Sequence, residues 1–270
     1  MSDAQEPTRI VFETLGGDGA PALLIHGFAS DRLSWGANQT AWQGVARLSS
    51  LDLPGHGESG MDVGDGRVTT LAHRVATLLD EQGLRRLHLI GHSLGGGVAL
   101  ILAHTRPDLV ASLALIAPAG LGEQVDPTFL AAYPDLTEPG ETEAMLHRLV
   151  VRPRLIGKPL VARVLNQLGK PGSREALRKI GDGIALSGPD LESAIASIGA
   201  STLPRLVLWG EQDAINPASE KKIRAFGGEL IKIPAAGHLP QIENLRLVNA
   251  AVANFLKSID ARGDRSGGAF

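Results

Sequence analysis

Hydrophobic residues gather in six short runs along the chain, and each run is followed by a turn-forming segment. The runs are 22–25, 48–51, 87–90, 113–116, 206–209 and 230–233. Most are too short and too continuously apolar for an amphipathic helix, so they predict strands that are buried on both faces, as in a parallel sheet. Lys232 interrupts the last run and predicts a strand at an exposed edge of the sheet.

Longer stretches with helical spacing separate these runs. They are 69–82, 94–105, 217–226 and 242–256. Strands that alternate with helices predict an α/β fold with a doubly wound, mostly parallel sheet. An active site in such a fold lies beyond the carboxyl ends of the strands, where the turns of this chain are rich in Gly, Ser, His and Asp.

The alternation stops between residues 121 and 201. This segment has no strand-like run, and helix-like pieces occur at 142–150, 159–168, 174–186 and 191–197. We interpret it as a helical cap inserted between two core strands, with an extension of the scaffold as the alternative. The predicted organisation is then a core formed by 1–120 and 202–260, a cap formed by 121–201 and a flexible tail formed by 261–270.

Composition narrows the classes of function. The chain has 270 residues, of which 43% are hydrophobic and 20% charged, with a net charge of −3 and no cysteine. These values fit a folded domain, exclude disulfide and thiolate chemistry, and give no indication of a nucleic-acid partner. Without an 18-residue apolar stretch or a signal-peptide pattern at the start, we expect no membrane association and a cytoplasmic location.

The segment 91–95 reads Gly-His-Ser-Leu-Gly, a G-x-S-x-G motif. The motif follows a predicted strand and opens a predicted helix, and this context indicates a nucleophilic serine on a sharp strand-to-helix turn. Small residues on both sides allow the turn to close. Ser93 is therefore the predicted nucleophile.

A serine hydroxyl needs an adjacent base, and the base needs an acid that fixes its tautomer. His238 follows the last predicted strand and lies on the same rim as Ser93. Asp213 follows the strand 206–209, which gives the order serine, acid, histidine along the chain. Glu211 is the nearest competitor for the acid, but it lies closer to the strand end.

Two turns offer backbone N–H groups for an oxyanion. The turn that contains Phe28 follows the strand 22–25, and Leu94 comes directly after the nucleophile. We interpret His26 and His56 as residues that stabilise turns. The other histidines lack ligand spacing, so the sequence predicts no metal site and no cofactor.

Together these segments resemble the α/β-hydrolase superfamily. The motifs that carry the resemblance are HGFASD (26–31), DLPGHGES (52–59), GHSLGG (91–96), WGEQD (209–213) and GHLPQIE (237–243). The resemblance implies the same fold and the same serine, aspartate and histidine as a catalytic triad.

Within this superfamily, the segments 51–60 and 112–122 look like the hydrolase-like domain of dihydrolipoamide acetyltransferase subunits of acetoin dehydrogenase complexes. No lipoyl domain precedes Thr8, so we expect a free-standing esterase-like enzyme. The segment 117–122 is also similar to carbon–carbon bond hydrolases of aromatic ring cleavage. His92 and Leu239 depart from the Asn and Trp that this second family usually carries.

We therefore expect hydrolysis of a small-molecule carboxylic ester through an acyl-enzyme on Ser93. One alternative is cleavage of a ring-fission dienone acid, whose carboxylate Arg152 or Arg154 of the cap would bind. Others are an acyltransferase or perhydrolase, and a non-catalytic module of a dehydrogenase complex.

Overall fold

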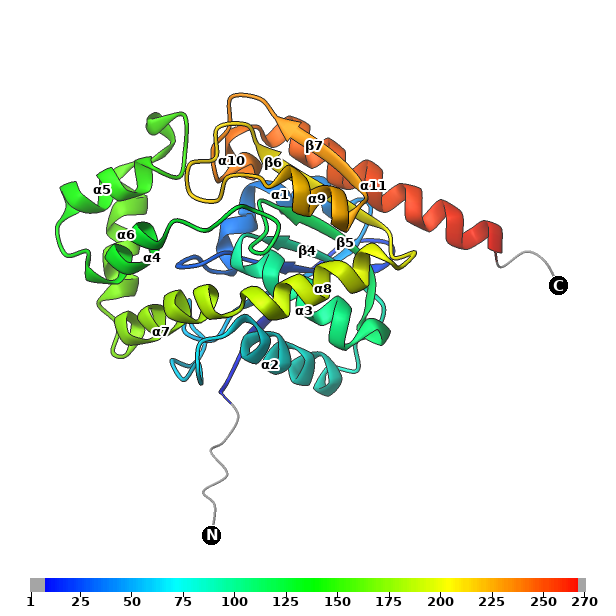
Figure 1. Ribbon diagram of the computed structural model, residues 1–270, viewed down its shortest axis with the longest axis horizontal. Helices are drawn as coiled ribbons and strands as arrows, with labels where there is room; N and C mark the ends of the chain where they lie inside the picture. Colours follow the sequence, from blue (N-terminus) through cyan, green and yellow to red (C-terminus); the bar gives the residue numbers. More distant parts are fainter. Residues whose placement is uncertain (1–7, 267–270) are drawn as a thin grey trace, which may run out of the picture.

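The computed structural model describes residues 8–266, which form a seven-stranded sheet with helices on both faces (Figure 1). The strands are β1 (Val11–Gly16), β2 (Pro21–Ile25), β3 (Arg47–Asp52), β4 (Leu87–His92), β5 (Val110–Ile116), β6 (Arg205–Gly210) and β7 (Glu229–Ile233). Their order in the sheet is β1-β3-β2-β4-β5-β6-β7. Every neighbouring pair is parallel except β1 with β3, which confirms the predicted doubly wound, mostly parallel α/β fold.

Eleven α-helices are described within this range. They are α1 (Gly36–Gln43), α2 (Val68–Glu81), α3 (Leu94–Thr105), α4 (Pro127–Ala132), α5 (Pro139–His147), α6 (Lys158–Leu168), α7 (Ser173–Leu186), α8 (Gly188–Gly199), α9 (Glu220–Phe226), α10 (Pro240–Glu243) and α11 (Leu245–Ser266). In this part of the chain, no helix is long and apolar enough to cross a membrane.

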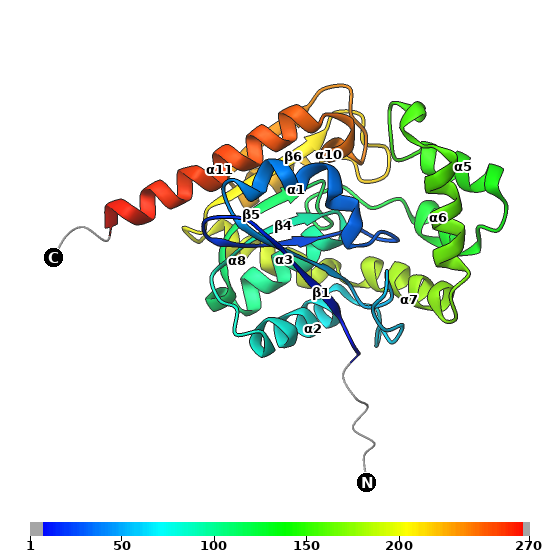
Figure 2. The same cartoon turned by 180° about the vertical axis from the view of Figure 1, so that it is seen from behind.

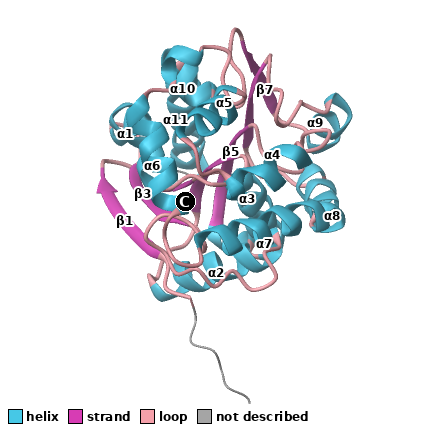
Figure 3. Ribbon diagram, turned by 90° about the vertical axis from the view of Figure 1, so that its left-hand side faces the viewer, coloured by secondary structure: helices cyan, strands magenta, loops and turns pink. Residues whose placement is uncertain are grey.

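Successive residues of the central strands face two different cores. Leu23 and Ile25 belong to a cluster that includes residues of α2, α3, α8 and α9, whereas Ala22 and Leu24 pack with residues of α1 and α11. This alternation follows from the two-residue period of a strand, and it explains why the strands read as continuous apolar runs. Figure 3 shows the sheet between the two helix layers.

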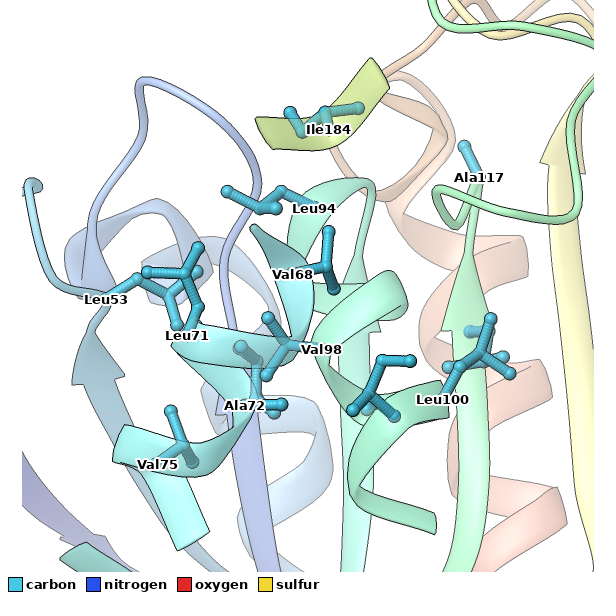
Figure 4. Packing of buried hydrophobic residues seen from close by; sticks show 14 of the residues in the cluster. Leu53, Val68, Leu71, Ala72, Val75, Leu94, Val98, Leu100, Ala117 and Ile184 are labelled. Atoms are coloured by element: carbon cyan, nitrogen blue, oxygen red, sulfur yellow. The ribbon is translucent and has the colours of Figure 1, made fainter. Parts of the chain in front are cut away.

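The larger core includes the first turn of α3, which follows Ser93. Val68 and Leu71 of α2 pack together with Leu94 and Val98 of α3 (Figure 4). All four side chains are fully buried. Burial of this kind stabilises a protein by roughly 1.5–3 kcal/mol for each large aliphatic side chain. This packing therefore stabilises the position of the start of α3.

Four helices of the insertion, α4 to α7, lie together at one end of the sheet, whereas the end of α11 projects from the other (Figures 1 and 2). The helix α8 differs from them because it packs against α3 and α9 in the layer that covers the sheet. The predicted cap reached residue 201, but its last helix is thus part of a core layer.

The structure differs from the sequence prediction in several elements. The strand β1 and the helices α1 and α4 are absent from the prediction. The predicted helix 242–256 is divided at Asn244, whose φ of −132° is not helical. The helix α11 continues to Ser266, so the predicted tail is helical as far as that residue, and its last four residues lie outside the described part of the chain.

Candidate active site

Ser93 occupies a strained turn between β4 and α3. Its φ of 50° falls in the left-handed region, which few residues other than glycine adopt. The Ser93 N–H donates to the Ile116 carbonyl at 3.0 Å and fixes the turn to the end of β5. A Cβ on Gly91 would lie 2.6 Å from the Gly95 carbonyl oxygen, and one on Gly95 would lie 2.2 Å from that of Ile25. Both glycines of the motif are therefore required by close backbone contacts.

The structure brings Ser93, His238 and Asp213 into one hydrogen-bonded chain. His238 Nδ1 lies 2.8 Å from Asp213 Oδ2, and His238 Nε2 lies 3.0 Å from Ser93 Oγ. A carboxylate can only accept, so Nδ1 carries the proton and Nε2 presents a lone pair to the serine hydroxyl. This tautomer is the one that a general base for Ser93 needs.

Asp213 is held by its own loop after β6. Its Oδ1 accepts the N–H groups of Ile215 and Asn216 at 3.0 and 2.9 Å. Burial opposes ionisation of Asp213, but the charge and hydrogen bond of His238 and the two backbone donors outweigh it and lower the pKa of this carboxyl. Glu211, the competing acid, is exposed, so the structure favours Asp213.

Three further buried histidines form hydrogen bonds around the site. His92 Nε2–H donates to the His238 carbonyl at 2.9 Å, and His26 Nε2 accepts the Leu53 N–H at 2.9 Å. His56 Nδ1–H donates to the Pro54 carbonyl at 2.9 Å. Burial lowers the pKa of His26 to about 4 and the pKa values of His56 and His92 to about 3, so all three are neutral at pH 7. These neutral side chains stabilise the loops around the site through their hydrogen bonds.

Phe28 and Leu94, the two predicted oxyanion donors, both line the cavity that Ser93 and His238 also line. Leu94 is the first residue of α3, and the first N–H groups of a helix have no partner within it. Phe28 belongs to a turn that the Ser30 N–H closes on the Gly27 carbonyl at 3.3 Å. Within residues 8–266, neither the Phe28 nor the Leu94 N–H donates to a protein acceptor. Both are free to bind a ligand oxygen.

A cavity of about 300 Å³ opens beside Ser93 and His238. Helices of the insertion supply much of its wall, and most of their side chains there are apolar: Phe129, Leu130, Tyr133, Leu146, Leu160, Val164, Leu168, Leu177 and Ile184. This volume is at the small end of the range for ligand pockets. The cavity suits a small, largely apolar molecule whose reacting group reaches Ser93.

The two predicted substrate-binding arginines lie elsewhere. Neither Arg152 nor Arg154 is among the residues that line the cavity. Arg154 is exposed, and Arg152 Nε lies 3.9 Å from the buried carboxylate of Glu243. The positions of both arginines depend on how the loop between α5 and α6 folds, which cannot be predicted from their charge alone.

Sequence reasoning missed the charged residues that do line the cavity. Arg163 of α6 pairs with Asp31, which follows the Phe28 turn. They are the only Arg, Lys, Asp or Glu side chains in the cavity wall among the described residues. The Arg163 charge stabilises ionised Asp31, whose pKa is lowered even though burial opposes this. A sequence signal existed in HGFASD, since its last residue follows the oxyanion turn.

Residues 8–266 contain no group of three His, Cys, Asp or Glu side chains that could hold a metal ion.

Comparison with known proteins places the chain in a family. The sequence profile of the Alpha/beta hydrolase family matches residues 22–251. The chain is 35% identical over 246 residues to the dihydrolipoyllysine-residue acetyltransferase component of the acetoin cleaving system of Pseudomonas putida, covering 91% of this chain and 66% of that protein. The chain thus spans less than two thirds of that relative's length.

Two hydrolases are also similar. The 2-hydroxymuconate semialdehyde hydrolase of Pseudomonas putida is 28% identical over 91% of this chain and 90% of its own length. The structure of a thermophilic esterase from Thermogutta terrifontis superimposes with a TM-score of 0.75 at 28% identity, covering 93% of this chain and 94% of the esterase. On the family match, the strand order and the serine turn, this chain belongs to the alpha/beta hydrolase family.

Proposed function

We propose that the protein is a serine esterase that hydrolyses a small, uncharged carboxylic ester through an acyl-enzyme on Ser93. The observation that carries the proposal is the hydrogen-bonded chain from Asp213 through His238 to Ser93, at 2.8 and 3.0 Å, beside an apolar cavity. A module that only bound ligands would not need a strained serine aligned with a histidine in this tautomer.

The proposed reaction has two halves. The Ser93 hydroxyl attacks the ester carbonyl while its proton moves to His238 Nε2, and the Phe28 and Leu94 N–H groups bind the oxyanion. The carbon–oxygen bond to the alcohol then breaks, and the alcohol takes the proton from His238. Water attacks the acyl-enzyme in the same way and releases the acid. The negative charge of Asp213 stabilises the imidazolium in both halves, and no cofactor takes part.

The charges in the cavity favour a neutral substrate. Arg163 is already paired with Asp31, so a substrate carboxylate would have to compete with that carboxylate for the guanidinium. The arginines that could have served a dienone acid, Arg152 and Arg154, do not reach the cavity. Carbon–carbon bond hydrolysis of a ring-fission acid is therefore the second candidate, and one relative is named a 2-hydroxymuconate semialdehyde hydrolase.

We also propose that α4 to α7 act as the cap that selects the acyl chain. They supply most of the apolar wall, whereas the three catalytic candidates come from turns of the core. Discrimination then arises from the fit of the acyl chain in the transition state. Transfer of the acyl group to an acceptor other than water would use the same Ser93 chemistry, and one relative is named an acetyltransferase component of an acetoin cleaving system.

A substrate panel tests this proposal. Aryl esters with acyl chains of two to twelve carbons are assayed beside a ring-fission dienone acid, with Ser93→Ala as the control. We expect turnover of the short and medium esters that the control lacks. Turnover of the dienone acid alone would replace ester hydrolysis by carbon–carbon hydrolysis, and no turnover of either would favour a binding module.

A further inference from the structure

The carboxylate of Glu243 is bonded to the loop of the catalytic histidine, and Glu243 is not among the residues that line the cavity. Glu243 ends α10, and its side chain is completely buried. A buried carboxylate without partners is strongly destabilising, so its surroundings should explain why it is there. Its partners are backbone groups from two segments that are far apart in the sequence.

The first segment is the histidine loop, residues 236–239. Glu243 Oε2 accepts the N–H of Gly237, the residue before His238, at 2.5 Å. The second is the cap stem, residues 149–152, by which the chain continues from α5 towards α6. Glu243 Oε1 accepts the N–H groups of Val151 and Arg152 at 2.9 and 3.0 Å. One carboxylate thus joins the base of the cap to the loop of the histidine.

The two segments also touch directly. The His238 N–H donates to the Leu149 carbonyl at 2.8 Å. A Cβ on Gly237 would lie 2.8 Å from that same oxygen, so the backbones are as close as glycine permits. On the other side, His92 holds the His238 carbonyl. The backbone of His238 is therefore fixed at its N–H by the cap stem and at its C=O by the nucleophile turn.

The cap stem also shapes the cavity. The Leu149 side chain lines it, while the Leu149 carbonyl holds His238. The segment that lines the cavity at Leu149 is hence also a segment that holds the histidine backbone. A general base must lie within hydrogen-bond reach of the proton that it takes, so a shift of this backbone alters catalysis directly.

From these contacts we infer that Glu243 is a positioning residue for His238, which ties the histidine loop to the cap stem and aligns the imidazole with Ser93. The inference rests on the proposed esterase function. It explains the burial of Glu243, and it assigns Arg152 a backbone contact with this carboxylate in place of the substrate contact expected from the sequence.

The test is kcat per active site in Glu243→Gln. An amide has one acceptor oxygen and one donor nitrogen, so it cannot accept from both segments, and the histidine loop is released from the cap stem. A fluorophosphonate counts the reactive Ser93 sites, and turnover of an aryl ester is divided by that count. We expect kcat per site to fall about 10- to 100-fold while KM changes less than about threefold.

Asp52→Asn is the matched control. Asp52 is also completely buried, and it bridges two segments by accepting the N–H groups of Arg32 and Glu58 at 2.7 and 2.9 Å. It bonds neither the histidine loop nor the cap stem. We expect this variant to lose stability and recoverable sites while kcat per site stays at the wild-type value. An equal fall in both variants would mean that any buried carboxylate has this effect, and the inference would be wrong.

An unchanged kcat per site in Glu243→Gln would overturn the inference, since a purely structural residue changes the number of sites and not their turnover. If Glu243→Gln does not fold, Glu243→Asp is measured in the same way. It keeps the charge but is one methylene shorter, so the same fall is expected, and wild-type turnover would again be contradictory. The wild type is assayed first: a wild type that is neither labelled nor active refutes the proposed esterase and not the Glu243 bridge.

Discussion

Replacement of Asp213 by Asn should abolish most of the catalysis without unfolding the protein. The geometry leaves the new amide little choice of orientation. Its oxygen has to accept the N–H groups of Ile215 and Asn216, as Oδ1 of Asp213 does at 3.0 and 2.9 Å. The NH₂ group then faces His238 Nδ1, which lies 2.8 Å from Oδ2 in the native chain.

A donor in that position reverses the tautomer of the histidine. Nδ1 has to accept, so the proton moves to Nε2, and His238 can no longer take the proton of Ser93. In other triads this change lowers kcat by roughly 10⁴. At 1.36 kcal/mol for each factor of ten, the loss of transition-state stabilisation is about 5 kcal/mol. The opposite amide orientation would set the NH₂ group against two N–H donors, which is also unfavourable.

The assay is steady-state turnover of an aryl ester, with thermal unfolding followed in parallel. Glu211→Gln is the control, because Glu211 lies two residues away and its side chain is exposed. We expect wild-type kcat in the control and an intact unfolding transition in both variants. Turnover by Asp213→Asn within about tenfold of the wild type, or its loss in Glu211→Gln, would show that Asp213 is not the acid.

Three further predictions concern stability and specificity. Burial lowers the pKa values of His26, His56 and His92, so the unfolded chain binds more protons than the folded one between about pH 3–4 and pH 6.5. The contribution of these histidines to the free energy of unfolding should therefore be largest above pH 6.5 and should decrease as the pH falls below that value. Denaturant titrations that show no pH dependence in this range would contradict the prediction. Ile184→Trp should fill part of the cavity and lower kcat/KM for long acyl chains at least about tenfold relative to acetyl esters, with labelling of Ser93 retained; uniform loss for all chains would contradict a selective wall. Gly95→Ala should destabilise the fold by about 3 kcal/mol, because the added Cβ would lie 2.2 Å from the Ile25 carbonyl oxygen. Gly44→Ala is the control, because a Cβ there meets no atom within 4 Å and should leave the stability unchanged. Equal urea unfolding midpoints for the two variants would refute the steric argument.

The central sheet could be predicted because buried parallel strands leave a strong signal. The six runs all correspond to strands: those in β2 to β6 are largely buried on both faces, whereas β7, the edge strand with Lys232, is only partly buried. The strand β1 was missed for the opposite reason. It is the antiparallel edge strand, two of its six residues are exposed and none is fully buried, so its sequence VFETLG has no continuous apolar run.

The catalytic candidates could be predicted because each follows a strand that ends on the same rim. Their spacing in the chain reflects topology, and the hydrogen bonds at 2.8 and 3.0 Å agree with the expected pairing. The cap could not be read in this way. Which side chains face a cavity depends on how several short helices pack, so charge alone led to Arg152 and Arg154, whereas Arg163 lines the cavity.

Helix boundaries were limited by local backbone geometry. The spacing in 242–256 suggested one helix, but Asn244 breaks it and places Glu243 at the end of a separate turn. That break allows the Glu243 carboxylate to reach both the histidine loop and the cap stem. Periodicity reports which residues face the core, and it does not report such breaks.

The central claim is that Ser93 is an activated nucleophile, and covalent labelling tests it most directly. The protein is treated with a fluorophosphonate, intact-mass spectrometry counts the adducts, and peptide mapping locates them, with Ser93→Ala as the control. The account predicts one adduct for each chain, on Ser93, and none in the control. An unlabelled wild type, or an adduct on another residue that persists in Ser93→Ala, would contradict it.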